Sequence, residues 1–258
     1  MNPDTNLPHG WRHRHLDETG STNADVLADA RAGDPGKLWL TASKQVSGRG
    51  RQGRVWVSEP GNLYATALLI DPAPIDRIGT LPFVAATALH AALAGLPGME
   101  RCQLRLKWPN DLLANSSKIS GILLESDQLK NGGIAVACGF GVNIAHHPDP
   151  ALYTATDLAA LAIKTTPQDV FTRLADSFDA LLRAWDHGRG FAAIRHEWLS
   201  HAKGRGEPVR VSLAGSSVEG IFEDIDMDGC LLLRHRDGTI QKISAGDVFF
   251  PQSFGASN

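Results

Sequence analysis

A basic, glycine-rich segment spans residues 48–54 and reads Gly-Arg-Gly-Arg-Gln-Gly-Arg. Its three arginines carry permanent charges on planar groups that suit phosphate or carboxylate. Its three glycines let the backbone approach a ligand closely and adopt positive φ. Like charges this close repel one another unless a counter-ion is present. The segment therefore predicts a loop that binds a polyanion, in preference to a merely solvated basic loop.

Gly48, Gly50 and Gly53 also match the GxGxxG spacing of dinucleotide-binding loops. Such loops need a helix directly after the glycines, so that its N-terminus meets the pyrophosphate. Residues 55–61 are instead typical of a strand and a turn, although Asp71 could take the place of the acid that binds the ribose. A nicotinamide-dependent oxidoreductase is therefore a second interpretation, from a different functional class.

Two further segments carry polar groups beside strands. Residues 107–111 read Lys-Trp-Pro-Asn-Asp, in which the proline fixes the turn and Asn110 and Asp111 can project an amide and a carboxylate into one pocket. Lys118 begins a very apolar segment and offers a point charge to a carboxylate or phosphate. Taken singly, the two patterns are also typical of an Asx turn and of a surface lysine.

Glycines at alternate positions mark residues 139–143, which read Gly-Phe-Gly-Val-Asn. Gly139 and Gly141 would let a ligand lie against the backbone of a strand. Taken alone, this pattern also indicates a β-bulge.

The elements that must position these residues follow from hydrophobic periodicity and turn residues. We expect helices over residues 24–32, 83–96 and 166–199. We expect strands over residues 37–42, 55–57, 63–70, 103–107, 119–125, 134–138 and 142–144. Short alternating segments beyond residue 204 predict a small β-barrel of roughly 50 residues. The predicted domains are residues 1–203 and 204–258.

Composition excludes several classes of protein. The 258 residues hold 25 Lys plus Arg and 28 Asp plus Glu, so the chain lacks the basic surplus typical of proteins that coat nucleic acid. Its three cysteines are far apart, which favours reduced thiols and a cytoplasmic protein. No signal peptide is visible, and residues 83–96 are too short to span a bilayer. We expect no metal site at His9, His13 and His15, because they lie at an end that we expect to fray.

Taken together, residues 21–23 (Ser-Thr-Asn), 48–56, 107–111, 118–125 and 139–144 resemble biotin protein ligase in order and spacing. The resemblance covers about residues 15–145, and the C-terminal β-domain is similar to the SH3-like domain of that family. It implies an α+β fold: a mixed β-sheet catalytic domain with flanking helices, like class II synthetases, plus a small SH3-like β-barrel.

The resemblance implies an enzyme that activates biotin with ATP and Mg²⁺ to biotinyl-5′-AMP. It then transfers biotin to a lysine of a biotin carboxyl carrier protein of acetyl-CoA carboxylase. A lipoate or octanoate ligase of the same superfamily is the alternative. We expect no nucleic-acid or membrane partner, and a homodimer is compatible with exposed strand edges. Some members begin with a DNA-binding winged helix; here only about 20 residues, broken by prolines, precede Ser21, so we expect no repressor function.

The resemblance also assigns roles to individual residues. The expected catalytic residues are Arg51, Arg54, Lys118 and Asp111. The expected biotin-binding residues are Ser21, Thr22, Asn23, Gln45, Gly48, Arg49, Gly50, Arg51, Lys118 and Gly121. The expected nucleotide-binding residues are Arg54, Trp56, Asn110, Asp111, Gly139, Gly141 and Asn143. No metal ligands are assigned. A further hypothesis makes Asp111 the acceptor of the proton from the incoming lysine.

Overall fold

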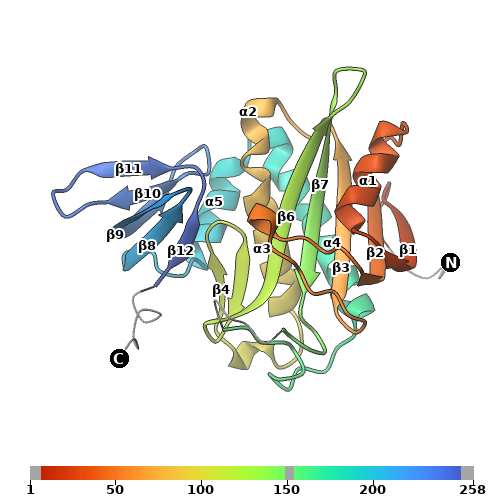
Figure 1. The fold of residues 1–258 in the computed structure, drawn as a ribbon, viewed down its shortest axis with the longest axis horizontal. Coiled ribbons are helices and arrows are strands. Elements are labelled where there is room, and N and C mark those ends of the chain that lie inside the picture. The colour runs from red at the N-terminus through yellow and green to blue at the C-terminus, as the bar shows by residue number, and fades with distance from the viewer. Residues whose placement is uncertain (1–6, 149–153, 251–258) are drawn as a thin grey trace.

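The computed structural model describes residues 7–148 and 154–250 and contains a large and a small β-sheet (Figure 1). The strands of the large sheet are β1 Arg12–Thr19, β2 Leu38–Gln45, β3 Leu63–Ile70, β4 Leu104–Lys107, β5 Asp111–Ala114, β6 Ser117–Gln128 and β7 Ile134–Val142. Their order across the sheet is β1-β2-β3-β7-β6-β5-β4. The sheet is mixed, because β1 pairs in parallel with β2 and the other neighbours are antiparallel.

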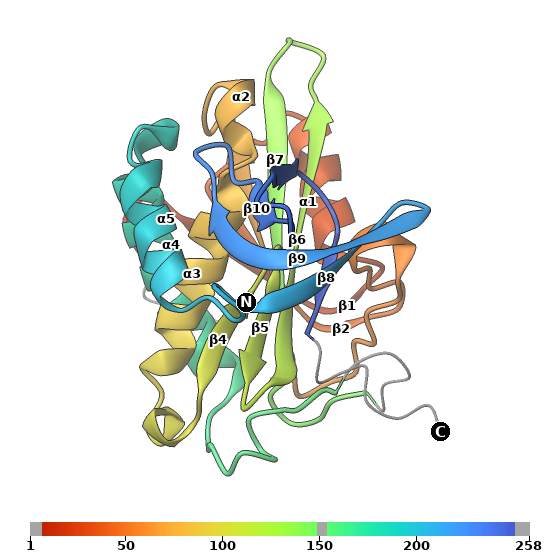
Figure 2. The same cartoon turned by 90° about the vertical axis from the view of Figure 1, so that its left-hand side faces the viewer.

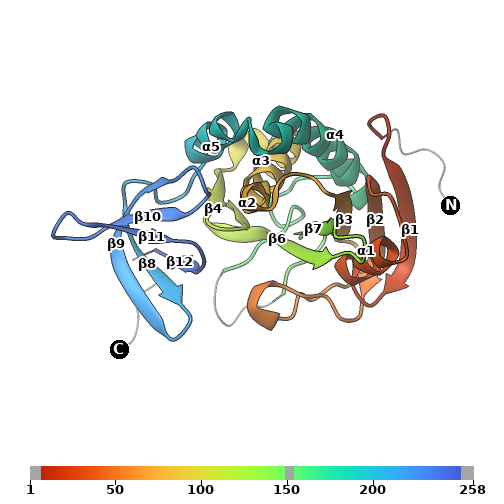
Figure 3. The same ribbon diagram turned by 90° about the horizontal axis from the view of Figure 1, so that it is seen from above.

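Helices cover both faces of this sheet. They are α1 Thr22–Arg31, α2 Ile75–Ile78, α3 Leu81–Ala94, α4 Pro167–Trp185 and α5 Phe191–Ser200. Seen from above, α1 lies on one face, whereas α3, α4 and α5 form a layer on the other (Figure 3). The main core lies under this layer, where the ring of Trp39 packs against Phe140, Phe171 and Phe178. The expected mixed sheet with flanking helices is confirmed.

Helix α3 is the central element of the helical layer. The stretch Ile75–Ala94 is long and apolar enough to cross a membrane by length and composition, but 67% of its apolar window is buried within the protein. It consists of two helices separated at Gly79 and Thr80, and α3 contacts α4, α5 and the sheet. The expected buried helix in this region is confirmed, and its burial explains its alanine-rich composition.

The small sheet contains β8 Pro208–Leu213, β9 Ser216–Ile225, β10 Leu231–Arg234, β11 Ile240–Ile243 and β12 Asp247–Phe249. All its strand pairs are antiparallel, in the order β11-β10-β9-β8-β12, as expected of the small C-terminal β-barrel. Figure 2 views the molecule with this sheet toward the reader, in front of β4 and β5. The two sheets are in contact: Trp108 Nε1 donates to the carbonyl of Gly229 at 3.4 Å, and Lys107 Nζ lies 5.5 Å from the ring of Phe249.

The expectation of a frayed N-terminal segment around His13 and His15 is wrong. Both residues lie in β1, which pairs with β2 along its whole length. Their rings hydrogen-bond to the hydroxyl of Thr41 on β2, at 2.8 and 2.9 Å. Strand β1 is mostly polar because it is the edge of the sheet, so hydrophobic alternation does not mark it.

Other boundaries also differ from expectation. Residues 134–142 form the single strand β7 through Gly139 and Gly141, where two strands over 134–138 and 142–144 were expected, and its pairing with β6 shows no bulge. Residues 55–57 form no strand of a sheet, and only Val55 among them makes an isolated bridge, to Arg49. Residues 166–199 contain two helices instead of one. Neither β5 nor β12 was expected, and β12 has only three residues, too few to show alternation.

Two histidines are held in their neutral form by the fold. His90 on α3 is buried and stacks on His201 with ring centres 3.9 Å apart; burial and this neighbour lower the pKa of His90 to about 4. Burial against Phe171, together with the nearby His15, lowers the pKa of His13 to about 4. An unfolded histidine takes up its proton near pH 6.5. The unfolded chain therefore binds more protons than the folded protein between pH 6.5 and 4.

We predict that the free energy of unfolding falls as the pH drops from about 6.5 toward 4, and that the substitution His90→Gln reduces this loss by up to about 3 kcal/mol. Urea unfolding of the full chain at pH 7 and at pH 4.5 measures the effect. The substitution His196→Gln, at an exposed position of α5, is the control and should keep the full loss. An equal loss in His90→Gln and in the unsubstituted protein would contradict the prediction.

Candidate active site

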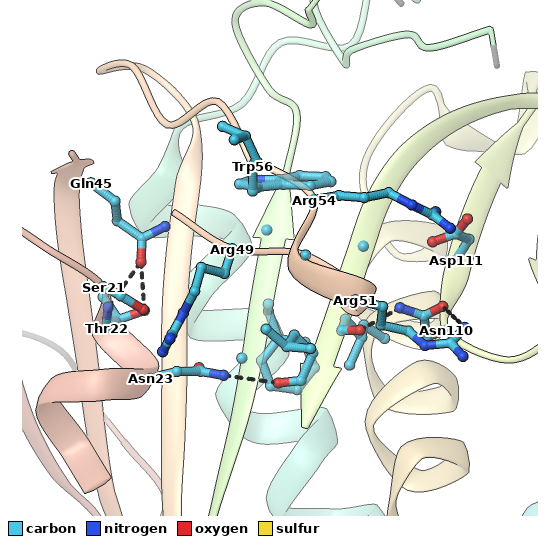
Figure 4. Close-up of a pocket in the computed structure, with 18 of the residues that line it drawn as sticks. Ser21, Thr22, Asn23, Gln45, Arg49, Arg51, Arg54, Trp56, Asn110 and Asp111 are labelled. Carbon is cyan, nitrogen blue, oxygen red and sulfur yellow. Dashed lines mark hydrogen bonds between the residues drawn. The ribbon is translucent and has the colours of Figure 1, made fainter. Parts of the chain in front are cut away.

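The residues singled out in the sequence converge on one pocket on the α1 face of the large sheet (Figure 4). All the expected site residues line it except Gly48 and Asn143. They come from the start of α1, the end of β2, the following glycine–arginine loop (residues 46–58), the β4–β5 turn, β6 and β7. The pocket also contains residues that were not expected: Val55, Ile122, Leu123, Phe140 and Asp247.

One end of the pocket is built from neutral polar groups at the start of α1. Gln45 Oε1 accepts hydrogen bonds from the backbone N–H of Thr22 at 2.9 Å and from its hydroxyl at 3.0 Å (Figure 4). The amide of Asn23 donates to the carbonyl of Leu123 at 3.1 Å and to Glu125 Oε2 at 2.9 Å. These side chains are held in place before any ligand binds. We call this end the pocket head.

Ser21 is the N-cap residue of α1, as its sequence pattern predicts, and its backbone is extended. Its side chain nevertheless caps nothing, and among the described residues its hydroxyl makes no hydrogen bond. Since Ser21 lines the pocket, this hydroxyl is available to a ligand.

The glycines of β6 and β7 make room for the pocket's own side chains. A Cβ on Gly139 would overlap the amide of Asn23, and one on Gly141 would overlap the indole of Trp56. A Cβ on Gly121 would lie 3.0 Å from the same indole. These glycines were expected to let a ligand approach the strands. In this structure the missing side chains leave room for the Trp56 indole and the Asn23 amide to contact the backbone of the sheet.

At the opposite end, Lys118 faces a carboxylate and an aromatic ring. Its Nζ lies 2.6 Å from Asp111 Oδ1 and 5.4 Å from the centre of the Trp56 ring. Lys107 lies beside them, with its Nζ 4.0 Å from Asp111 Oδ2. Burial lowers the pKa of Lys107, and the neighbouring Asp111 opposes that shift. One carboxylate therefore balances two ammonium groups.

The arginines of the loop meet an acid from the small sheet. Asp247 at the start of β12 pairs with Arg51 at 3.3 Å and also with Arg54. The Arg51 guanidinium additionally donates to Asn110 Oδ1 and to the carbonyl of Gly246, both at 3.2 Å. Burial lowers the pKa of Arg51, whereas the charge of Asp247 raises it. No pattern in the sequence near residue 247 pointed to this contact, because it joins residues 193 to 196 positions apart.

The third arginine of the loop turns toward the pocket head. Arg49 lies 3.4 Å from Glu125 Oε1, and Figure 4 shows its side chain extending toward Asn23. Glu125 was not assigned a role from the sequence. It connects the loop to the pocket head, because its other oxygen accepts from Asn23.

Gly48 and Asn143 lie behind the lining of the pocket. The Gly48 carbonyl accepts from Trp56 N–H at 2.9 Å, and a Cβ on this glycine would overlap the Trp56 carbonyl. The Asn143 amide is buried and donates to the carbonyl of Thr156 at 3.1 Å. Their assignment as ligand contacts stays a prediction; both support neighbouring chain segments here.

The loop does not have the form that a dinucleotide site requires. Residues Arg51–Gly53 form a single 3-10 turn, and Val55 then bridges back to Arg49 in antiparallel fashion. No helix follows the glycines, so the pyrophosphate site of the oxidoreductase interpretation is missing from this part of the chain. The described residues also contain no group of three or more His, Cys, Asp or Glu side chains that could hold a metal ion.

Comparison with known proteins agrees with this site. Residues 21–143 match the family described as Biotin/lipoate A/B protein ligase, and residues 205–250 match the Biotin protein ligase C terminal domain. The chain is 40% identical to the biotin–[acetyl-CoA-carboxylase] ligase of Paracoccus denitrificans, over 91% of this chain and 99% of that protein. It is 33% identical to the ligase of the same name from Mycobacterium tuberculosis, over 93% of this chain and 89% of that protein.

Among solved structures, the fold is similar to biotin protein ligase from Aquifex aeolicus in complex with biotin and ATP. The TM-score is 0.76 with 25% identity, and the alignment covers 92% of this chain and 97% of that one. Both the sequence and the fold match over nearly the full length of these proteins. The chain belongs to the biotin protein ligase family.

Proposed function

We propose that this protein is a biotin–[acetyl-CoA-carboxylase] ligase, an enzyme that forms a carbon–nitrogen bond in two steps. Biotin and ATP first give biotinyl-5′-AMP and pyrophosphate, and a lysine of a biotin carboxyl carrier protein then displaces AMP. The observation that carries the proposal is the division of one pocket into a neutral, hydrogen-bonded head at Thr22 and Asn23 and a cationic end at Arg51 and Lys118. The names of the relatives agree with this activity.

The cationic end fits the first step. The biotin carboxylate attacks the α-phosphate, and the bond from the α-phosphorus to the pyrophosphate oxygen breaks. Negative charge then builds on the phosphorus oxygens, so preoriented cations supply most of the stabilisation. Lys118 would contact the biotin carboxylate and the α-phosphate. Arg51 and Arg54 would release Asp247, with which they pair in this structure, and contact the phosphates instead. Trp56, on Gly141, would flank the adenylate.

The neutral end fits the bicyclic head of biotin. Ser21, Thr22, Asn23 and Gln45 present hydroxyl and amide groups at hydrogen-bonding positions. A ureido ring both donates and accepts hydrogen bonds. The dithiolane ring of lipoate and the alkyl chain of octanoate contain neither an N–H donor nor a carbonyl acceptor. The polar head therefore favours biotin over the substrates of lipoate or octanoate ligases.

Exclusion of water matters because a mixed anhydride hydrolyses readily. The glycine–arginine loop carries three exposed apolar side chains, Val46, Val55 and Val57. We propose that the loop closes over the bound adenylate and removes these side chains from water.

Magnesium is the metal that accompanies ATP in this proposal. Mg²⁺ is usually held by one or two carboxylates together with phosphate oxygens. Asp111 and Asn110 supply one carboxylate and one amide oxygen beside the cationic end. These residues fit a metal that arrives on the nucleotide, and the ion would neutralise phosphate charge when bound.

The two predicted domains would have different roles. We assign residues 1–203 to biotin and ATP binding and residues 204–258 to the SH3-like C-terminal domain, which contributes Asp247 to the pocket. The free thiols of Cys102, Cys138 and Cys230 fit a reducing cytoplasm. A homodimer through a sheet edge remains a prediction.

We predict biotin-dependent exchange of labelled pyrophosphate into ATP, with lipoate and octanoate as controls. Exchange with biotin alone is the expected result, because it requires reversible formation of biotinyl-5′-AMP. Exchange with lipoate in place of biotin would assign the protein to the alternative activity. Absence of exchange with all three acids would overturn the proposal.

The substitution Lys118→Gln should lower kcat of this exchange by about 100-fold, because it removes one preoriented cation from the developing phosphorus charge. The matched control is Lys130→Gln, at an exposed position beyond the end of β6. Steady-state kinetics of both variants measures the effect. A Lys118→Gln variant as active as the control would remove Lys118 from the catalytic assignment.

If Asp111 accepts the proton of the incoming lysine, Asp111→Asn should slow biotin transfer from supplied biotinyl-5′-AMP by about 100-fold. Transfer to the carrier domain is measured without ATP, so that the first step does not contribute. Asp127→Asn on β6, where the acid pairs with Arg31 at 2.5 Å, is the control. Full transfer by Asp111→Asn would refute this role and leave the adenylation site intact.

A further inference from the structure

The backbone of Lys118 pairs with a segment that belongs to no strand of the large sheet. Strand β7, which pairs with β6, ends at Val142 and does not extend as far as Lys118. Residues 154–156 take its place and run parallel to β6 at this point. The Lys118 N–H donates to the Thr154 carbonyl, and the Lys118 carbonyl accepts from the Thr156 N–H, both at 2.9 Å. The backbone position of Lys118 therefore depends on what holds residues 154–156.

We infer that Asp157 and His147 are positioning residues for Lys118, because their ion pair holds the segment that pairs with its backbone. Neither of the two lines the pocket, and neither was assigned a role from the sequence. The inference rests on the proposed function, in which the Lys118 ammonium contacts the biotin carboxylate and the α-phosphate.

Asp157 follows directly on the segment and has only 4% of its surface exposed. Its Oδ1 accepts from the Ala160 N–H at 2.6 Å, and its Oδ2 lies 2.6 Å from His147 Nδ1. A carboxylate only accepts hydrogen bonds, so the imidazole nitrogen carries the proton that lies between them. A buried carboxylate that lost one of these partners would be left desolvated and unpaired, which is costly. The chain at residue 157 is therefore held where both contacts are made.

The chain that leads to His147 is itself held by a buried amide. Asn62 lies directly before β3 and is 3% exposed. Its Oδ1 accepts from the Ile144 N–H at 2.8 Å, and its Nδ2 donates to the His146 carbonyl at 2.9 Å. The imidazole thus reaches Asp157 from a segment that is attached to the large sheet.

Asn143 joins the same two segments without a charge. Its side-chain amide donates to the Thr156 carbonyl at 3.1 Å, and its backbone carbonyl accepts from the Leu158 N–H at 3.2 Å. Its own N–H donates to the carbonyl of Ile119, the residue after Lys118. Neutral bonds and one ion pair therefore act together on the chain beside Lys118.

The position of the Lys118 ammonium follows from its backbone. Its Nζ lies 2.6 Å from Asp111 Oδ1 and 5.4 Å from the centre of the Trp56 ring. A shift of the backbone would move this cation away from the charge that develops on the α-phosphate. Since a misplacement of about 1 Å can cost about 100-fold in rate, a partial loss of this support should be visible in kcat.

The test is a double-variant comparison, using biotin-dependent pyrophosphate exchange by the full chain. Asp157→Ala should lower kcat by about tenfold, because it loosens the support of Lys118. In a chain that also carries Lys118→Gln, the same substitution should change kcat by less than about twofold, because the group through which it acts is gone. A tenfold loss in both backgrounds would overturn the inference.

His147 supplies a second pair of variants, at an exposed position where substitution disturbs packing little. His147→Ala removes one of the two partners of Asp157 and should lower kcat by about threefold, and again only in the presence of Lys118. His147→Asn offers a side-chain N–H in place of Nδ1–H and should restore kcat. If Asp157→Ala does not fold, these two variants decide the question in the same comparison.

The matched control is Asp179→Ala, at an acid of α4 that is also buried, with 5% of its surface exposed. It likewise combines one neutral donor, Trp11 Nε1 at 2.9 Å, with one cation, Arg183. Helix α4 lies on the face of the sheet opposite α1 and the pocket (Figure 3). Asp179→Ala should destabilise the fold and leave kcat within about twofold.

The outcomes separate the inference from the proposed function. Absence of biotin-dependent exchange in the unsubstituted protein would overturn the proposed function itself. Normal exchange in that protein, with kcat unchanged in Asp157→Ala and in His147→Ala, would overturn the inference alone. Equal losses of kcat in Asp157→Ala and Asp179→Ala would also overturn it, since a general loss of stability would then be the cause.

Discussion

The structure of the pocket depends above all on the balance between its cationic side chains and the acids that face them. Arginines and lysines brought this close together repel one another strongly in a partly buried site, and the fold can hold them only if acids face them. The acids come from three separate strands: Asp111 begins β5, Glu125 lies on β6 and Asp247 begins β12. Each pairs with at least one cation of the site. The order of strands in the large sheet and the position of the small sheet are therefore both part of the binding site, because they deliver these carboxylates.

The two ends of the pocket meet different physical requirements. At the pocket head, Thr22, Asn23 and Gln45 are hydrogen-bonded within the protein, so these side chains have a determined direction before a ligand arrives, and little conformational entropy is lost on binding. The cationic end uses ion pairs in which a phosphate can replace the carboxylate, because both groups offer a guanidinium two anionic oxygens for parallel hydrogen bonds. One site thus combines a preoriented head for one substrate with a cationic end whose ion pairs can be replaced by those to the other substrate.

Two glycines of β7 allow the residues of the pocket to pack directly on the large sheet. Gly139 and Gly141 lie within a regular strand, where a side chain would ordinarily add packing and stability. Their missing side chains let Asn23 and Trp56 lie directly on the sheet, which brings the start of α1 and the glycine–arginine loop to the same strand. The cost in strand stability is offset by pairing with β3 and β6 along both sides of β7.

The sequence by itself determined the chemistry of the site and the elements with strong local patterns. The glycine–arginine segment, Lys-Trp-Pro-Asn-Asp and the boundaries of β3 could all be identified, because residue type, turn preference and alternation are properties of neighbouring residues. The tertiary structure alone decided which charges meet and which way each amide points. Asp247 reaches Arg51 across 196 positions, and Thr66 reaches Asn23 across 43. Edge strand β1 and the short strand β12 depend on pairing with distant partners in the same way. Such contacts form only when packed sheets bring the chain segments together, and no local period encodes them.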